Sequence, residues 1–204
     1  MGRPREFDTD IAIERAMTLF WDVGYEEASM ANLLNTMEIT KGSFYKAFGD
    51  KRSVYLDAID KYDAEVVNLA VTYLQDPGNG TGYERILFLF DKTFINGTEE
   101  ERRRGCFLCN AMVDQAAHNQ VIQARLNAMA KKIEDAVTKA LRDPNEDGTT
   151  LTEKEARKRA RASHALFIGM RVLGRLGITE EEVKDTREQL KQLLCRKPAS
   201  FKQA

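Results

Sequence analysis

The residues of this chain whose types and spacing suit a chemical task lie in the stretch 28–53. Ser29 and Thr40 each precede a short segment in which apolar residues recur every three or four positions, as they do on a helix with one buried face. Each hydroxyl can accept a hydrogen bond from an N–H group of the first helical turn. The pattern predicts two short helices joined by a turn at 38–39, with the N-terminus of the second helix, 41–47, open to anions such as phosphate.

This second helix has two different faces. Ile39, Phe44 and Phe48 are expected to face the core. The outward positions carry hydrogen-bond donors and one aromatic ring, with no acidic residue: Thr40, Lys41, Gly42, Ser43, Tyr45 and Lys46. A helix-turn-helix places a helix of this kind in the major groove of DNA with its N-terminus first. The residues therefore predict a helix-turn-helix.

Three cysteines and two histidines are candidates for redox or metal chemistry. Cys106 and Cys109 form a Cys-x-x-Cys pair, but zinc needs two further ligands, and the two histidines, His118 and His164, are isolated in the sequence. We therefore expect no metal site and no cofactor. Two interpretations of the pair stay open: a thiol switch activated by the arginines at 102–104, or two small buried apolar residues. Without a nucleophilic serine or a glycine-rich turn, no catalytic site is expected, and the chain is not expected to be an enzyme.

Composition and charge favour a globular helical protein. The chain has 204 residues, 43% of them hydrophobic and 31% charged, and only four prolines. Its net charge of −1 does not exclude nucleic acid, because affinity depends on where the lysines lie, and residues 40–53 are locally basic. No apolar run approaches the length of a membrane span, and the N-terminus lacks the apolar core of a signal peptide. With an odd number of cysteines, these features predict a cytoplasmic protein without a membrane partner.

Helical spacing continues through the rest of the chain, interrupted by two loops rich in helix-breaking residues at 76–82 and 143–148. The segments expected to be helical are 9–23, 51–75, 83–95, 106–117, 119–142, 153–176 and 180–195. Capping boxes mark helix starts at Thr98/Glu101, Thr152/Glu155 and Thr179/Glu182. We expect an all-α protein of about nine helices. Residues 1-50 would form a three-helix DNA-binding domain with the helix-turn-helix, and residues 51-204 a larger helical domain.

Two surfaces of that larger domain are expected to meet partners. Small and apolar residues on the last two helices suit a four-helix bundle with a second copy of the chain, although the same helices can instead be buried within one protomer. The expected dimer residues are Ala162, Ala165, Gly169, Val172, Leu173, Val183, Leu190 and Leu194. A polar stripe at four-residue steps, Cys106, Asn110, Asp114 and His118, can line a small-molecule pocket or form a solvated helix edge. The other expected pocket residues are Tyr62, Phe90, Phe94, Phe167 and Met170.

The chain resembles the TetR/AcrR family of bacterial transcriptional regulators across essentially its whole length. The resemblance rests on the stretches AMTLFWDVGYEEASM and ANLLNTMEITKGSFYKAFGDKRSVY, with matching positions at Gly24, Tyr25, Ser29, Lys41, Gly42, Ser43, Phe44, Tyr45, Phe48 and Lys51. Lys46 and Ala47 stand where the family often has histidine or aromatic residues, and Arg52 stands where an acidic residue is usual. These departures bear on operator preference. The blocks RGCFL, from Arg104, and ALFIGMR, from Ala165, resemble one branch of the family more weakly.

The resemblance implies a homodimeric, ligand-responsive regulator, most simply a repressor, that binds a palindromic DNA operator and is released by a small-molecule effector held in residues 51-204. Carried onto this sequence, the residues that meet or position DNA are Ser29, Thr40, Lys41, Gly42, Ser43, Tyr45, Lys46 and Lys51. Arg3 and Arg5, on a polar arm, either are disordered or contact DNA phosphates or the minor groove. Two alternatives stay open: a thiol-sensing regulator using Cys106 and Cys109, and a helical enzyme or small-molecule carrier with an incidental helix-turn-helix.

Overall fold

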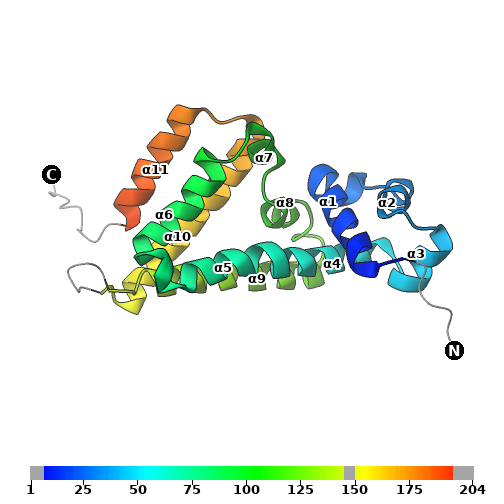
Figure 1. Cartoon of the computed structure of the whole chain (residues 1–204), viewed down its shortest axis with the longest axis horizontal. Helices are drawn as coiled ribbons and strands as arrows, with labels where there is room; N and C mark the ends of the chain where they lie inside the picture. The colour runs from blue at the N-terminus through cyan, green and yellow to red at the C-terminus, as the bar shows by residue number, and fades with distance from the viewer. Residues whose placement is uncertain (1–6, 145–149, 195–204) are drawn as a thin grey trace. The chain divides into compact units, whose positions relative to one another are not determined.

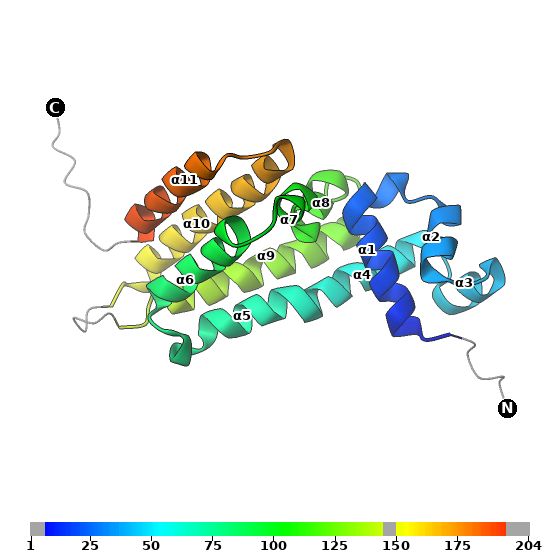
Figure 2. The same ribbon diagram turned by 45° about the horizontal axis from the view of Figure 1, so that its top comes forward.

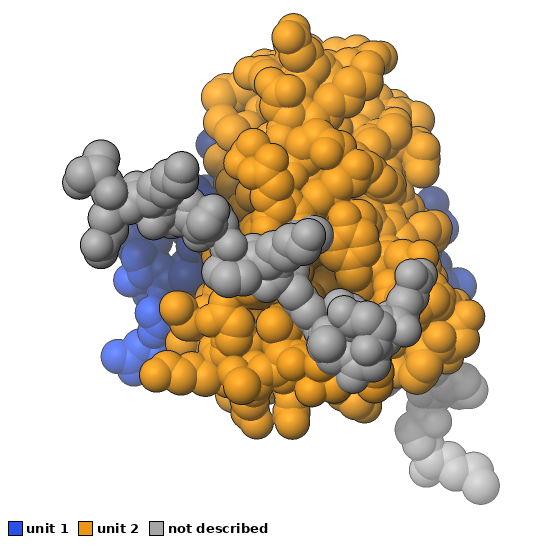
Figure 3. Space-filling view, turned by 90° about the vertical axis from the view of Figure 1, so that its left-hand side faces the viewer, with its two compact units in different colours: residues 1–69, 104–130 blue, residues 70–103, 131–204 orange. Residues whose placement is uncertain are grey.

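The computed structural model describes residues 7–144 and 150–194, and within these ranges every regular element is a helix. The expected all-α fold is confirmed there. Arg3, Arg5 and Cys195 lie outside the described residues. Two compact units make up the chain: unit 1 combines residues 1–69 with 104–130, and unit 2 combines residues 70–103 with 131–204 (Figure 3). The expected division at residue 50 does not coincide with a boundary between these units. As a division between DNA binding and effector binding, it stays a prediction.

Unit 1 begins with α1 (Thr9–Glu27), α2 (Met30–Met37) and α3 (Lys41–Phe48) (Figure 1). Asp8 caps α1 by accepting hydrogen bonds from the N–H groups of residues 10 and 11. The regular part of α1 ends at Gly24, as the sequence predicts, because Gly24 has a φ of +83° and a ψ of 171° inside the assigned helix.

Aromatic rings hold the middle of unit 1 together. The ring of Phe20 in α1 meets Tyr55 in α4 (Lys51–Tyr62) edge to face at 4.9 Å between centroids. Tyr55 in turn meets Phe107 in α8 (Phe107–Asp114) at 5.8 Å. These three side chains are almost fully buried, and their burial raises the pKa of the Tyr55 hydroxyl. The contacts pack α1, α4 and α8 into one core.

The expected long helix 51–75 is present. It consists of α4, a π-helical turn at Asp63–Val67, and α5 (Asn68–Gln75). The boundary between the units falls within it, between Leu69 and Ala70. The π turn inserts a wider i→i+5 backbone bond into the helix, which the apolar spacing does not reveal.

Unit 2 is a bundle of helices. After a 3-10 turn at Pro77–Asn79 come α6 (Gly82–Phe90), which continues into a π turn at Asp91–Ile95, and α7 (Glu99–Arg104). The later part of α9 (Gln120–Ala140), α10 (Glu153–Leu173) with a 3-10 turn at Gly174–Leu176, and α11 (Glu180–Leu194) complete it. α11 packs against both α6 and α10, and Figure 2 shows it running beside α10.

The core of unit 2 needs a glycine at one point. A Cβ added to Gly82, the first residue of α6, would lie 1.7 Å from the carbonyl oxygen of Ala140 at the end of α9. Only glycine allows this close approach of backbones. Elsewhere in the unit, Arg187 of α11 forms two hydrogen bonds of 2.6 Å with the carboxylate of Asp91, and this carboxylate raises the pKa of the guanidinium.

The capping boxes are confirmed at two of the three expected places. At Thr98/Glu101 and Thr179/Glu182 the threonine hydroxyl accepts from the glutamate N–H, and the glutamate carboxylate accepts from the threonine N–H. Thr152 caps α10, but the carboxylate of Glu155 lies 3.0 Å from Nε of Arg159 and completes no box. None of the described helices is long and apolar enough to cross a membrane.

Candidate nucleic-acid interface and ligand groove

The turn that leads into α3 is fixed by caps and by one strained residue. Ser29 accepts a hydrogen bond from Asn32 N–H at 3.1 Å, and Thr40 accepts from Ser43 N–H at 3.2 Å. Between the two helices Glu38 has a left-handed φ of 56°, which is uncommon for a residue with a side chain. Its carboxylate forms an ion pair of 2.6 Å with Arg15 of α1. The expected turn at 38–39 is present, and α1 helps to hold it.

The two faces of α3 are divided largely as the sequence predicts. Phe44 is fully buried, while Ile39 and Phe48 are only half-buried. On the other side Thr40, Lys41, Gly42, Tyr45 and Lys46 are exposed, and Ser43 is half-buried. The Tyr45 ring is 48% exposed and lies edge to face with Phe44 at 5.5 Å, so its position is fixed from below. An aromatic ring held at the surface in this way is available to a partner.

The outward face of α3 is positively charged, and its two lysines are exposed. Neither Lys41 nor Lys46 forms an ion pair with another described residue, and the first turn of α3 holds no acidic residue. The N–H groups of that turn add the positive end of the helix dipole. Phosphate oxygens are the ligands that such a surface attracts.

Lys51, another expected DNA-binding residue, has partners within the chain, and its role in positioning DNA stays a prediction. Its ammonium group donates to the carbonyl oxygen of Glu26 at 3.3 Å and lies 4.5 Å from the centre of the Tyr25 ring. Arg52 bonds the side chain of Asn119 at 3.2 Å. The sequence shows the charge of both residues but not these partners, which are distant in the chain.

The expected effector residues in unit 1 do not form one helical stripe. α8 ends at Asp114, so His118 lies beyond the helix and is exposed, and Cys106 is the residue that precedes α8. Asn110 donates to the carbonyl oxygen of Arg104 at 3.2 Å. Tyr62 and Cys106 are brought together: the hydroxyl oxygen and Sγ are 3.2 Å apart, and both residues are buried. The expected continuation of this helix to 117 is wrong, because its last hydrogen-bonded turn closes at 115.

The expected effector residues of unit 2 lie in its core. Phe90, Phe94 and Met170 are buried and Phe167 is half-buried. The Phe94 ring is 4.8 Å from Phe90 and 5.1 Å from Phe167 between centroids. A role for these residues, and for those in unit 1, in binding a ligand stays a prediction.

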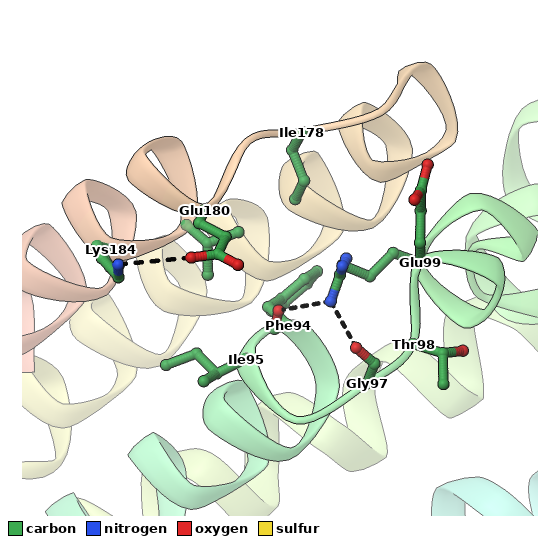
Figure 4. Close-up of a pocket in the computed structure, with 10 residues that line it drawn as sticks. Phe94, Ile95, Gly97, Thr98, Glu99, Ile178, Glu180 and Lys184 are labelled. Carbon is green, nitrogen blue, oxygen red and sulfur yellow. Dashed lines mark hydrogen bonds and ion pairs between the residues drawn. The ribbon is translucent and has the colours of Figure 1, made fainter.

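A groove in unit 2 was not expected from the sequence (Figure 4). It consists of two hollows of about 300 and 330 Å³ that share Glu99, Arg102, Ile178 and Glu180. Phe94, Ile95, Ile178 and Val183 are the apolar side chains that line the first hollow, and Phe94 is the one expected effector residue among the residues that line the groove. The sequence did not reveal it because its walls come from residues 94–103 and 174–184, two segments that are far apart in the chain. Among the described residues no group of three or more His, Cys, Asp or Glu side chains is placed to hold a metal ion.

The expected dimer residues fall into two groups. Ala162, Ala165, Val172 and Leu173 are exposed on α10, and a Cβ added to Gly169 would meet nothing within 4 Å. In contrast, three residues of α11 are at most 4% exposed and belong to the core of unit 2: Val183, Leu190 and Leu194. The expectation that these three side chains lie on an outer face is wrong, because the apolar side of α11 packs on its own protomer.

Two family models match the chain. The model described as "Bacterial regulatory proteins, tetR family" covers residues 12–58, and "Tetracyclin repressor-like, C-terminal domain" covers residues 82–190. Among curated relatives, the uncharacterized HTH-type transcriptional regulator YezE of Bacillus subtilis (strain 168) is 33% identical over 137 residues, or 67% of this chain and 69% of YezE. The HTH-type transcriptional repressor ComR of Escherichia coli (strain K12) is 38% identical over 61 residues, or 30% of this chain and 29% of ComR.

Solved structures show the same likeness. The TetR family regulator CifR, as a cysteine mutant in complex with 26-bp operator DNA, is 27% identical with a TM-score of 0.79, covering 93% of this chain and 98% of CifR. Reduced NemR of E. coli has a TM-score of 0.77 at 20% identity, covering 91% of this chain and 97% of NemR, and shows the fold alone. The C-terminal family model spans more than half of the chain, and the first model spans the helix-turn-helix. This chain therefore belongs to the TetR family of transcriptional regulators, which bind DNA and are not enzymes.

Proposed function

We propose that this protein is a homodimeric repressor that binds a palindromic operator through α3 and releases it when a small molecule binds. The observation that carries the proposal is the exposed face of α3, on which Lys41, Tyr45 and Lys46 project without an acidic neighbour in the first turn. CifR, which is similar to this chain over 93% of its length, has been solved with operator DNA, and ComR and NemR carry the name repressor. A cytoplasmic location follows from this role in a bacterium.

The side chains of α3 have distinct tasks in this proposal. Lys41 and Lys46 neutralise phosphates or donate to guanine, and Tyr45 contacts a phosphate or a thymine methyl group. Gly42 allows the DNA backbone or a base edge to come close, and Ser43 lies in the first turn beside it. Ser29 and Thr40 open helix N-termini toward phosphates. Arg3 and Arg5 would extend the contact along the duplex.

Dimerisation through α10 is supported by the spacing of its exposed apolar residues. On α10, Ala162, Ala165, the half-buried Gly169 and Val172 follow one another by three and four residues in alternation, which is the repeat of two helices that pack along each other, and Leu176 in the 3-10 turn after α10 continues the spacing. Val172 and Leu176 are 41% and 80% exposed in the single protomer. The small residues at the first three positions let two backbones approach. A second copy of the chain fits this stripe because a twofold axis pairs it with itself.

The dimer has a direct test. Val172→Asp places a carboxylate within the stripe, and the sedimentation coefficient of the variant should fall to that of a monomer. Glu188→Gln on the exposed side of α11 serves as a control that should stay dimeric. A monomeric wild-type protein at micromolar concentration, or a dimeric Val172→Asp variant, would contradict this assignment.

The effector is expected in residues 51-204, and the groove in unit 2 is a candidate for its site. Phe94, Ile178 and Val183 supply an apolar wall, while Lys184 and Glu180 form an ion pair of 3.6 Å at its rim. A small molecule with an apolar body and one polar group suits such a wall. To release DNA, the molecule must bind the conformation with low operator affinity more tightly than the other.

Operator binding and release are tested together. Full-length protein incubated with sheared genomic DNA is recovered, and the bound fragments are sequenced and searched for a palindrome. We expect one enriched palindrome, which a Lys41→Ala plus Tyr45→Ala variant fails to enrich. Small molecules suggested by the neighbouring genes are then added to the complex. Recovery of random fragments by the wild-type protein would overturn the proposal.

A thiol-sensing regulator is a second candidate, favoured by the 3.2 Å contact between the Tyr62 hydroxyl and Sγ of Cys106. A hydroxyl at this distance can donate to a thiolate. Burial of Cys106 and Cys109, 8% and 4% exposed, works against it because an oxidant must reach the sulfur. If Cys106→Ser and Cys109→Ser variants release the operator normally under hydrogen peroxide, thiol sensing is excluded. An enzyme with an incidental helix-turn-helix is not supported, since the relatives are regulators.

A further inference from the structure

The end of α1 is tied to the segment 104–119 within unit 1. Nε of Arg104 lies 2.5 Å from the carboxylate of Asp22, and its guanidinium lies 4.2 Å from the centre of the Trp21 ring. These two contacts combine an ion pair and a cation–π interaction on one side chain. They bind the last full turns of α1 to the residue with which the chain re-enters unit 1.

A second contact follows where α1 loses its helical geometry. Oδ2 of Asp114, the last residue of α8, accepts a hydrogen bond of 3.2 Å from the N–H group of Tyr25. Gly24, immediately before, has a φ of +83°. The same carboxylate oxygen also lies close to Gly24, since a Cβ added to Gly24 would be 3.7 Å from it. One residue further along each segment, Nε2 of Gln115 lies 3.4 Å from the carboxylate of Glu26.

This break is the point at which the chain leaves α1 for the helix-turn-helix. Only Glu27 and Ala28 separate Glu26 from the Ser29 cap of α2. The direction of the chain at residues 24–26 therefore sets where α2 and α3 begin. An N–H group at a helix break has lost its regular carbonyl acceptor and needs another partner, which Asp114 supplies.

We infer that Asp114 and Arg104 are positioning residues for operator binding, which hold residues 22–26 so that α3 is presented in one orientation. The inference rests on the proposed function, and adds to it a direct connection from α8 to the helix-turn-helix of α2 and α3, here called the head, that does not pass along the α4–α5 helix. A head that is already held in one orientation loses less conformational entropy when it binds DNA. Releasing it lowers affinity without removing any side chain that contacts DNA.

The structure offers a matched control in the same unit. Arg125 and Asp60 form an ion pair of 2.8 Å with side chains 36% and 54% exposed, close to the 31% and 48% of Arg104 and Asp22. This pair joins α9 to α4 and does not touch residues 22–28. Replacing it should change stability as much as replacing Arg104, and operator affinity much less.

The test measures affinity for the selected palindrome and amide exchange of Tyr25 in full-length variants that are folded at the assay temperature. We expect Asp114→Ala and Arg104→Gln to weaken binding about tenfold and about threefold. Asp114→Asn, which keeps an acceptor oxygen, should stay within about twofold of wild type. The Tyr25 amide should exchange faster in Asp114→Ala and not in Asp60→Ala.

Three results would overturn the inference: Asp114→Ala binding within twofold of wild type, Asp114→Asn losing as much affinity as Asp114→Ala, or Asp60→Ala losing as much as Arg104→Gln. Failure of the proposed function looks different. In that case the wild-type protein itself selects no palindrome, while the exchange of the Tyr25 amide still reports whether Asp114 holds it.

Discussion

The two lysines on the exposed face of α3 allow a quantitative prediction about salt. Lys41 and Lys46 form no ion pair with other described residues, so each is free to neutralise one DNA phosphate. For duplex DNA each neutralised phosphate contributes about −0.9 to the slope of log affinity against log salt concentration. Two such lysines in each of two heads make four contacts, or a contribution of about −3.6 to the slope.

The perturbation is Lys41→Gln, which removes the charge and leaves a polar side chain one atom shorter. One contact is lost in each head, so the slope should become shallower by about 1.8. Between 50 and 200 mM salt, the variant should then lose roughly tenfold less affinity than the wild type. Lys46→Gln should act in the same way, and the double variant should change the slope by about 3.6.

The assay is fluorescence anisotropy with a labelled duplex at four or more salt concentrations. Lys158→Gln on α10 is the control, because its side chain is 71% exposed and lies in unit 2. An unchanged slope for Lys41→Gln, or an equal change for Lys158→Gln, refutes the assignment of phosphate contacts to α3. A lower affinity with an unchanged slope would show that Lys41 contacts a base and not a phosphate.

Three further predictions concern stability. Gly82→Ala should lower the free energy of unfolding by about 3 kcal/mol, because the added Cβ falls 1.7 Å from the carbonyl oxygen of Ala140. An unchanged melting temperature would contradict this close approach. Burial lowers the pKa of His164 below its ordinary 6.5, although the nearby charge of Glu134 acts in the opposite direction. Below pH 6.5 the unfolded chain therefore takes up a proton at His164 that the folded chain does not, and the free energy of unfolding falls as the pH drops through 6.5. In urea titrations, the loss of stability between pH 7.5 and pH 5.5 should be smaller for His164→Gln than for the wild type. An equal loss in both proteins would rule out this role of His164. Asp50→Ala should cost about 1 kcal/mol by removing the cap of α4, measured against Asp57→Ala on the same helix.

Local signals in the sequence predicted local structure well. Thr179 with Glu182 marks the start of α11, and Ser29 and Thr40 cap α2 and α3, because capping depends on residues three positions apart. The outward face of α3 was predictable for the same reason. A helix of eight residues leaves little choice about which side chains share a face.

What the sequence did not reveal depends on partners far away in the chain. The spacing of the apolar residues of α11 suits a dimer interface and a protomer core equally well. The sequence therefore predicts Val183 and Leu190 at an interface, whereas both lie in the core of unit 2. The end of α8 at Asp114 has no proline or glycine to mark it. Asp114 belongs to the polar stripe expected to line a pocket, and the sequence does not reveal that its carboxylate accepts a hydrogen bond from a backbone N–H group 89 residues away.

In the proposed function, α3 reads a specific DNA sequence. The most direct test is the ratio of affinities for the selected palindrome and for a scrambled duplex of the same composition, at one salt concentration. For the wild-type protein the ratio should exceed about 1,000. For Lys41→Ala plus Tyr45→Ala it should fall toward one while the protein stays folded and dimeric. A ratio that survives this double substitution would contradict the account.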